Sequence, residues 1–536
     1  MRWIDVNILA LGREMRLSYL PPLMVYVAYG ISGLTGIVGT FFVKDYLGLS
    51  AAFLAALSFW GVIPWALKMP LGHLVDLLWR WKSWLVFLGA GLIGASLLIM
   101  VGLLTDRAAM TAVMPAEAWY VCSFLLAPVG YVIQDVVADA MTVEAVPRVD
   151  EHGKPVPQEA RKLMNTTMQT LGRVALIGGL ALVAAINLYL FEGVETLTEA
   201  EKVAVYRSIY LSAMAIPLIS IAGIAFAYFL KRREARLLLA RGMDPAQVRK
   251  LLLEPEERPA PNWWILGGSL VFVAFSLGMG FSSIRYNQEI IFAGSLAIIV
   301  FLITKLTREL EPEARATLAG TALVIFVFRA VPTVGDGLTW WMIDVLKFDQ
   351  QFLAVLSLIA SVLTLFGMFL FRRFMAERSI VYVVGFLTVV GAVLSLPVVG
   401  LFYGLHHWTA ALTGGMVNAH FIVIVNTALE SPLGQISMIP LLAWIANSAP
   451  RNLKATYFAI MASFTNLALS AAQLGTKYLN ETFVVTREVK DAATGAVQLS
   501  ADYSHLGEIL VVQLVIALTL PFAAILIVRH SRLRSA

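Results

Sequence analysis

Long apolar runs separated by short polar turns recur along this chain of 536 residues. A helix needs about 20 predominantly apolar residues to cross the hydrocarbon core of a bilayer, and these runs reach that length. The pattern predicts six spans in the first half of the chain and six in the second. Their expected ranges are 20–43, 51–78, 83–105, 118–145, 165–190, 207–230, 317–343, 351–371, 379–402, 417–448, 454–478 and 507–529.

A polar stretch lies between the two sets of spans. Its leucines recur at helical spacing, which predicts an amphipathic helix on the membrane surface, closed by a Pro-rich linker. Two further apolar segments, 262–284 and 289–304, follow this stretch and raise the expected number of spans to about fourteen. We therefore expect four parts: an N-terminal six-helix bundle (1–230), a cytoplasmic linker (231–261), an inserted helix pair (262–316) and a C-terminal six-helix bundle (317–536).

The two halves of the chain resemble each other. Residues 45–58 (DYLGLSAAFLAALS) align with residues 344–357 (DVLKFDQQFLAVLS) at one offset, 344 − 45 = 299, and seven of the fourteen positions are identical. The ends of the fourth spans also correspond, at 146–148 and 449–451. Secondary transporters are often built from two such repeats, with the solute bound near the midplane between them. The expected fold class is an all-α polytopic membrane protein.

Composition supports this fold class. Hydrophobic residues make up 59% of the chain and charged residues 14%, whereas a soluble domain has about 25% charged residues. The runs lack the short alternation of a membrane β-barrel.

The single cysteine, Cys122, excludes a disulfide framework and provides no metal cluster. A phosphate-binding loop, zinc-ligand spacing and a Cys–His nucleophile are missing from the sequence, so we expect no enzyme, no cofactor and no metal site.

The distribution of basic residues predicts the orientation. If the N-terminus is cytoplasmic, 28 of the 40 Lys and Arg residues lie in segments facing the cytoplasm and nine lie in segments on the other side. Short loops rich in Lys and Arg stay on the cytoplasmic side of a membrane. Both termini are therefore expected in the cytoplasm. Topology, rather than a nucleic-acid partner, explains the net charge of +5.

The turn after the second span carries a charged motif. Its pattern, G-x-L-x-D-x-x-x-R-x-K, resembles the loop signature between helices 2 and 3 of major facilitator transporters. We interpret the motif as a gate, in which an aspartate at a helix end pairs with cations and neighbouring helix ends in one state only. The gate residues are Gly72, Asp76, Arg80 and Lys82.

Three longer stretches resemble the folate–biopterin transporter family of the major facilitator superfamily. They are LGLSAAFLAALSFWGVIPWALKMPLGHLVD (47–76), DVVADAMTVE (135–144) and SMIPLLAWIANSAPRNLKATYFAIMASFTNLA (437–468), and they occur in the family's order. The resemblance implies the major facilitator fold, with two six-helix bundles. The helix pair at 262–304 is an addition to that fold.

Four ionisable residues of the first half are expected at one depth of the membrane: Lys68, Asp135, Asp139 and Arg173. Charged side chains are costly inside a bilayer, so their presence favours a function. Asp135 and Asp139 are four residues apart and share a helix face. One hypothesis is a proton-coupling or substrate-binding cluster. The alternative is a static ion-pair network that holds helices 2, 4 and 5 together.

The second half offers three further candidates. Arg329 and Asp336 are seven residues apart, which predicts that they share one face of the seventh span, and Pro332 and Gly335 predict a break in that helix. Arg329 is the candidate for an anionic group of the substrate, or it forms a salt bridge to Asp336 or Glu430. Glu430 is expected inside its span and is a second candidate carboxylate.

Other polar and aromatic residues within the spans have two interpretations. Gln134 lines a pathway or forms hydrogen bonds between helices. His420 fits a packed helix residue better than a proton relay. Tyr29 and Tyr131 stack on a flat ring of the substrate or simply pack, and a place in the interfacial belt or packing is favoured for Trp340 and Trp341.

The family resemblance implies a secondary active transporter that moves a pterin- or folate-like organic anion by alternating access, in symport with protons. It also implies a monomer in the inner membrane of a bacterial cell, with the lipid bilayer, the solute and protons as partners. The chain departs from the family pattern at Met69, after Lys68, and at Val75, before Asp76. Two other functions therefore stay open: a permease or exporter of another solute, such as a cell-wall fragment or a drug, and a non-transporting assembly factor or sensor.

Overall fold

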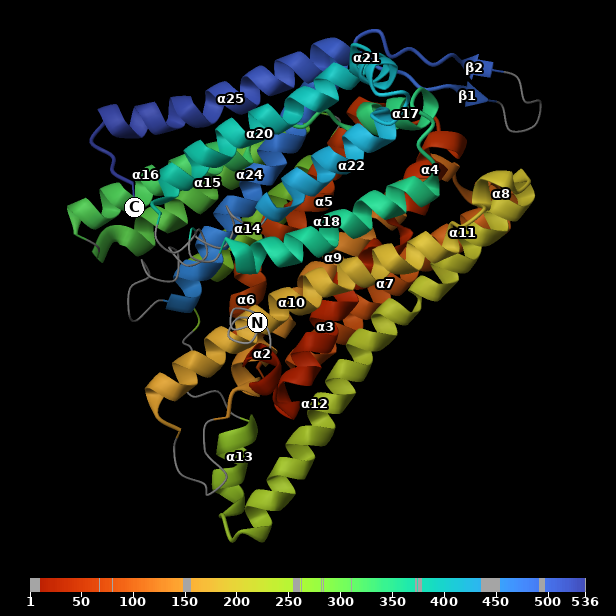
Figure 1. The fold of residues 1–536 in the computed structure, drawn as a ribbon. Helices are drawn as coiled ribbons and strands as arrows, with labels where there is room; N and C mark the ends of the chain where they lie inside the picture. The colour runs from red at the N-terminus through yellow and green to blue at the C-terminus, as the bar shows by residue number, and fades with distance from the viewer. Residues whose placement is uncertain are drawn as a thin grey trace. The chain divides into compact units, whose positions relative to one another are not determined.

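The structure is a computed structural model of the whole chain. It describes residues 10–535 except 67, 80, 148–155, 254–260, 262, 281, 283, 310, 372, 373, 375–377, 435–453 and 491–496. The described chain is helical apart from one small antiparallel pair of strands, β1 (Val489–Lys490) and β2 (Val497–Leu499) (Figure 1). Ten helical segments in the described residues are long and apolar enough to cross a membrane, and two shorter apolar helices accompany them.

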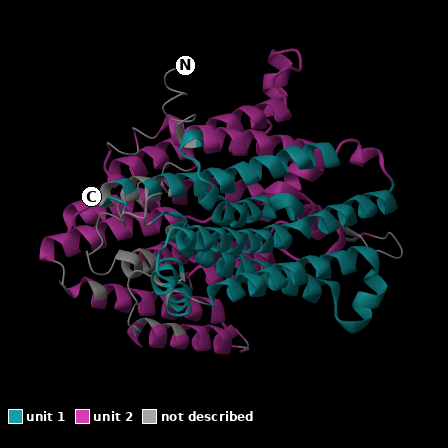
Figure 2. Cartoon of the chain, turned by 90° about the horizontal axis from the view of Figure 1, so that it is seen from below, with its two compact units in different colours: residues 1–36, 70–190, 198–262 teal, residues 37–69, 191–197, 263–536 magenta. Residues whose placement is uncertain are grey.

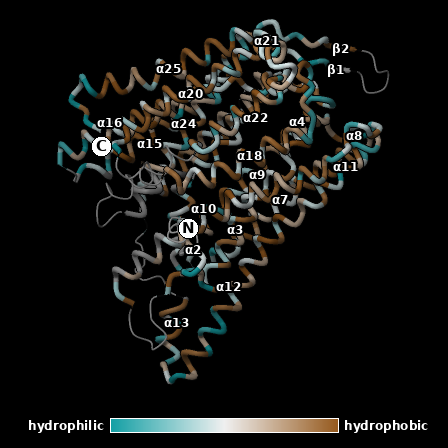
Figure 3. Tube along the Cα trace, in the orientation of Figure 1, coloured by the Kyte–Doolittle hydropathy of each residue, from teal (hydrophilic) through white to brown (hydrophobic). Residues whose placement is uncertain are grey.

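These segments confirm an all-α polytopic membrane protein, although the expected number of fourteen spans is not confirmed. Hydrophobic residues run along helices such as α20 and α25, and hydrophilic residues gather around α8 (Figure 3). The chain forms two compact units, shown in Figure 2. Unit 1 consists of residues 1–36, 70–190 and 198–262, and unit 2 of residues 37–69, 191–197 and 263–536.

In unit 1, helix α7 lies along α9, and α3 packs against α9, α10 and α12. The approach of α7 to α9 depends on two glycines, because a Cβ on Gly130 would lie 2.7 Å from the carbonyl oxygen of Gly89. The elements are α2 (Ala10–Arg13), η2 (Leu17–Tyr19), α3 (Leu20–Gly30), η3 (Ile31–Thr35), α6 (Lys68–Leu77), α7 (Lys82–Thr105), α8 (Arg107–Val113), α9 (Ala116–Ala145), α10 (Gln158–Leu190), α11 (Glu199–Ala213), α12 (Ala215–Ala240) and α13 (Pro245–Leu253).

The predicted sixth span is two helices in the structure. Helix α11 begins at a capping box, in which Thr198 and Glu201 satisfy each other's backbone N–H groups. Helix α12 then continues to Ala240, ten residues beyond the predicted end of the span at 230. The separate amphipathic helix is therefore shorter than the sequence suggests and consists of α13 alone.

In unit 2, α5 packs along α24, and α20 lies beside α25. The added helices α14 and α15 pack against each other, and α15 also packs against α24. The elements are α4 (Gly36–Tyr46), α5 (Ala51–Ala66), η4 (Val194–Thr196), α14 (Trp263–Gly280), α15 (Asn287–Leu306), η5 (Thr307–Glu309), α16 (Pro312–Arg329), α17 (Asp336–Asp344), α18 (Gln350–Leu370), α20 (Ile380–Phe402), α21 (Leu405–Leu412), α22 (Ala419–Glu430), η6 (Ser431–Leu433), α24 (Lys454–Thr482), β1, β2 and α25 (Leu506–His530).

The internal repeat extends to local structure. Helix α5 begins at Ala51 and α18 at Gln350, and 350 − 51 = 299, the offset found in the sequence. Both helices have an N-terminal side-chain cap at the equivalent position. The Oγ of Ser50 accepts from the backbone N–H of Phe53 at 3.1 Å, and Asp349 accepts from Phe352 at 2.6 Å.

The predicted break in the seventh span is confirmed, because α16 ends at Arg329 and α17 begins at Asp336. The prediction that these two residues share a helix face is wrong, since a seven-residue spacing defines a face only in a continuous helix. Side chains of α24 satisfy the backbone of the break. Asn480 donates to the carbonyl of Val334 at 3.0 Å, and Thr476 Oγ1 accepts from the N–H of Thr333 at 2.9 Å.

Substitution of Gly335 by alanine is expected to destabilise the protein by about 1–3 kcal/mol. Gly335 has φ 87° and ψ −174°, a conformation open essentially only to glycine, and a Cβ there would lie 2.9 Å from Nδ2 of Asn480. The measurement is the thermal unfolding midpoint of the purified protein. The matched control is Gly391→Ala in α20, where nothing lies within 4 Å of the added methyl group. An unchanged midpoint for Gly335→Ala would contradict the expectation.

Candidate functional site

Tyr26 on α3 lies at the centre of a charged cluster in unit 1. Its hydroxyl donates a hydrogen bond of 2.6 Å to the carboxylate of Asp139 on α9. The charges of Asp135, on the same helix, and of Arg173 on α10 also act on this hydroxyl. The structure therefore brings together three of the four residues predicted from the first half of the chain, around a buried tyrosine that sequence analysis did not identify.

Glycines set the spacing of this cluster. Gly172, the neighbour of Arg173, lies against the ring of Tyr26, and a Cβ at Gly172 would be 3.0 Å from that ring. Further along the same two helices, a Cβ at Gly179 would lie 2.9 Å from the Cα of Gly30. Helices α3 and α10 therefore touch through their backbones, and this contact keeps the tyrosine hydroxyl near the arginine.

An aromatic pair lies one helical turn from the cluster. The rings of Tyr29 and Tyr131 have centroids 5.4 Å apart and are tilted by 50°. Tyr29 follows Tyr26 by three residues on α3, and Tyr131 precedes Asp135 by four residues on α9, so each ring lies on the helix face of its charged or polar neighbour. Both tyrosines are half-buried. Unit 1 thus presents two aromatic rings beside two carboxylates and a guanidinium.

The gate residue Lys82 binds a carboxylate. Its Nζ lies 2.5 Å from the carboxylate of Glu144 on α9, and Lys231 on α12 binds the other oxygen at 2.9 Å. Lys82 is 5% exposed and its ammonium lies 3.4 Å above the ring of Trp79. Sequence analysis included Glu144 in the DVVADAMTVE stretch but gave it no role. A carboxylate placed between two lysines joins α7, α9 and α12.

The other gate residues are partly described. Helix α6 contains Lys68, Gly72 and the backbone of Asp76. The side chain of Asp76 and the whole of Arg80 lie outside the described residues. Lys68 is half-buried at the start of α6 and belongs to the residues of unit 2. Its proposed meeting with Asp135 therefore stays a prediction.

The candidates of the second half lie at the ends of three helices. Arg329 ends α16, and Asp336, which begins α17, is half-buried and lies within range of the charge of Arg487. Glu430 is the last residue of α22 and is exposed, and its expected place inside a span at 417–448 stays a prediction. Residues 435–453 of that range lie outside the described residues.

Three side chains for which the sequence left two interpretations have packing roles in the structure. Gln134 is buried, donates to the carbonyl of Val86 and accepts from Ser220, so it links three helices. The ring of His420 packs against two phenylalanine rings with centroids 4.7 and 4.5 Å away. Trp340 is fully buried in unit 2. These contacts favour helix packing over a pathway or relay role.

Residues 289–534 match the sequence model of the BT1 family. The chain is 23% identical over 462 residues to a protein of Synechocystis sp. named folate-biopterin transporter, and the alignment covers 85% of this chain and 74% of that protein. Two similar solved structures are a POT family transporter in complex with 5-aminolevulinic acid and the nucleoside transporter NupG. The first has a TM-score of 0.59 at 11% identity and covers 95% of each chain. The second has a TM-score of 0.54 at 11% identity and covers 95% of this chain and 99% of that one.

The likeness to these structures shows the fold. It is the fold of major facilitator transporters, which confirms the fold that the family resemblance implied.

Proposed function

We propose that this chain is a membrane transporter that moves a pterin- or folate-like organic anion by alternating access, coupled to protons. The similarity of residues 289–534 to the BT1 family and of most of the chain to a folate-biopterin transporter supports this proposal. The observation that carries this proposal is the cluster of Tyr26, Asp135, Asp139 and Arg173 beside the Tyr29–Tyr131 ring pair.

The chemistry of the cluster suits such a solute. The edge of a pterin ring has adjacent N–H donors, which a carboxylate binds in a bidentate manner. The tail of a folate has carboxylates, which a guanidinium such as that of Arg173 binds equally well. Flat rings stack against aromatic side chains, and Tyr29 and Tyr131 lie within one helical turn of these charges.

Coupling to protons needs a carboxylate that exchanges its partner during the cycle. Asp139 accepts a hydrogen bond from Tyr26. In this proposal Asp139 therefore keeps that bond throughout the cycle, and Asp135 is the carboxylate that binds and releases the proton. In this proposal Asp135 takes up a proton when the solute occupies Arg173, because an ionised carboxylate without a cation is costly inside a membrane.

The orientation and the division into bundles are parts of the same proposal. The Lys and Arg count supports cytoplasmic termini. We propose the inner membrane of a bacterial cell because the family resemblance implies it. We propose the four-part division, with bundles at 1–230 and 317–536, and a monomer in which one repeat moves against the other.

Uptake by the purified protein in proteoliposomes tests the proposal. We expect accumulation of labelled folate or biopterin that increases with an imposed proton gradient and is competed by unlabelled pterins but not by lactate. In a parallel thermal-shift assay, a ligand at 100 times its Kd stabilises the folded state by about 2.7 kcal/mol. Protein-free liposomes are the control. If neither pterins nor folates shift the melting temperature or compete, another solute is transported, and a tightly co-purifying partner without any transport would favour the assembly-factor alternative.

A further inference from the structure

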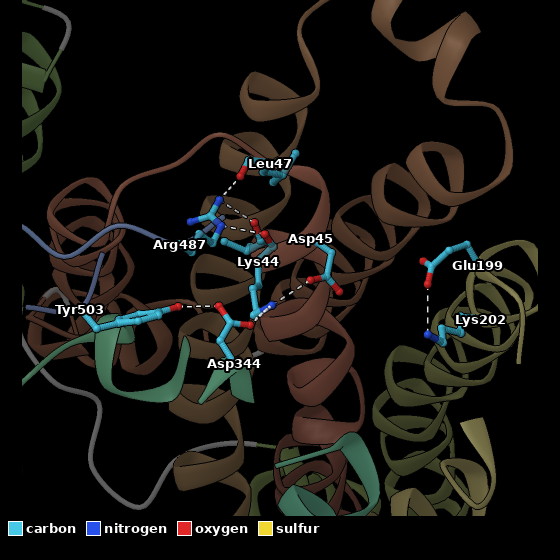
Figure 4. Close-up of polar contacts among 9 residues, drawn as sticks. Lys44, Asp45, Leu47, Glu199, Lys202, Asp344, Arg487 and Tyr503 are labelled. Carbon is cyan, nitrogen blue, oxygen red and sulfur yellow. Dashed lines mark hydrogen bonds and ion pairs between the residues drawn. The ribbon is translucent and has the colours of Figure 1, made fainter. Parts of the chain in front are cut away.

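Arg487 lies in the connection between α24 and α25 and is 2% exposed. Its guanidinium donates hydrogen bonds to backbone carbonyls at the end of α4 and just beyond it. The bonds to Lys44, Leu49 and Val43 measure 2.7, 2.6 and 2.8 Å. A further bond reaches the carbonyl of Leu47, as Figure 4 shows. One side chain therefore binds four carbonyls of a segment more than 400 residues earlier in the chain.

The arrangement follows from the properties of a helix end. The last carbonyls of an α-helix have no partner within the helix and carry its partial negative charge. A guanidinium has five N–H donors in a fixed fork, so it binds several of these carbonyls at once. The guanidinium also lies 4.5 Å from the centroid of the Trp340 ring on α17. Burial lowers the pKa of Arg487, but a guanidinium keeps its charge in proteins.

A second set of contacts joins the same two helix ends. The Nζ of Lys44 lies 2.6 Å from the carboxylate of Asp344 at the end of α17 and 3.3 Å from that of Asp45. Tyr503 donates to the other oxygen of Asp344 at 2.5 Å (Figure 4). Burial and this hydrogen bond raise the pKa of the Tyr503 phenol, so it stays a donor at neutral pH.

Backbone pairing places Arg487 and Tyr503 close together. Thr486 and Asp502 exchange both of their backbone hydrogen bonds at 2.9 Å. Arg487 and Tyr503 are the next residues in sequence. Their side chains therefore extend from one short antiparallel backbone pair to α4 and α17.

The two helix ends are equivalent in the repeat. Asp45 and Asp344 occupy matching positions, 344 − 45 = 299, and Lys44 binds both. When one repeat moves against the other, contacts between corresponding ends of the repeats have to break in one state. The Lys44–Asp344 ion pair, whose side chains are 13% and 23% exposed, suits such a reversible contact, because water replaces the lost partners on opening.

We propose that Arg487, Tyr503, Lys44 and Asp344 form a clasp that holds the ends of α4 and α17 together and opens during the transport cycle. The proposal rests on alternating access as the proposed function. It assigns a conformational role to Arg487 and Tyr503, which supply two of the four side chains.

Cysteine accessibility tests the clasp without any solute. Ala51, which is 2% exposed at the start of α5, is the site of the reporter substitution Ala51→Cys, in a Cys122→Ser background that removes the single native cysteine. The rate of labelling by a membrane-impermeant maleimide is measured in nanodiscs. Arg487→Gln is expected to raise this rate about tenfold, which corresponds to about 1.4 kcal/mol in the opening equilibrium.

Two further variants keep this test decisive. Asp344→Asn removes the ion pair but leaves the four carbonyl bonds of Arg487, and it is expected to raise the labelling rate if Arg487→Gln does not fold. Lys202→Gln is the matched control, because it removes an ion pair of 3.0 Å with Glu199 on α11, also shown in Figure 4. Unchanged labelling in both clasp variants overturns the proposal.

A cross-link separates failure of the clasp from failure of the proposed function. Lys44→Cys and Asp344→Cys are joined by a short bis-methanethiosulfonate, and uptake is measured before and after reduction. We expect uptake to be lost on cross-linking and restored by the reductant. Full uptake by the cross-linked protein contradicts the clasp, whereas absence of uptake by the wild-type protein contradicts the proposed function and leaves the labelling result valid.

Discussion

Proton-driven uptake is expected to fall about a hundredfold when Asp135 is replaced by asparagine, which corresponds to about 2.7 kcal/mol. Asparagine has nearly the same shape but cannot carry a proton, so the step that couples proton movement to the conformational change is lost. Exchange of labelled against unlabelled solute, which needs no net proton movement, is expected to persist. The measurement compares uptake under an imposed proton gradient with counterflow in the same proteoliposomes.

Two variants in the same cluster serve as controls for Asp135→Asn. Tyr26→Phe removes the hydrogen bond to Asp139 but keeps the ring against Gly172, and it is expected to weaken uptake and counterflow together. Asp139→Asn, which alters the same bond, should have the same effect. An Asp135→Asn protein with full uptake that still depends on pH would exclude Asp135 from the coupling role.

Glu144→Gln is expected to reduce the stability of the folded protein by about 3–5 kcal/mol, the usual cost of removing one partner from a buried ion pair. The substitution removes the carboxylate that neutralises Lys82 and Lys231, while their positive charges stay within the helix bundle. The measurement is the thermal or denaturant-induced unfolding of the purified protein in one detergent.

A surface pair and a double variant complete this experiment. Glu199→Gln breaks an ion pair whose carboxylate side chain is 73% exposed, and it is expected to cost less than about 1 kcal/mol. Adding Lys82→Met to Glu144→Gln should restore part of the loss, because an apolar side chain replaces the charge. A Glu144→Gln protein as stable as the wild type would show that Glu144 does not hold these helices together.

Local sequence patterns predicted much of the molecule. Apolar runs of helical length specified the membrane helices, because satisfying the backbone inside a bilayer leaves almost no other structure for such a run. The 299-residue offset predicted equivalent helices, and the caps at Ser50 and Asp349 repeat at that offset. Pro332 and Gly335 predicted the break before α17 because each disfavours a continuous helix through its backbone.

The partners of the charged residues were decided by the tertiary structure. Tyr26 and Asp139 are 113 positions apart, Lys82 and Glu144 are 62 apart, and Arg487 and Lys44 are 443 apart. Nothing local specifies these pairs, since they depend on which helix faces meet and how closely glycines let the backbones approach. The sequence alone thus determined where helices form and that they cross a membrane, because both depend on neighbouring residues. Which charges meet follows from packing over the whole chain, and only the folded structure shows it.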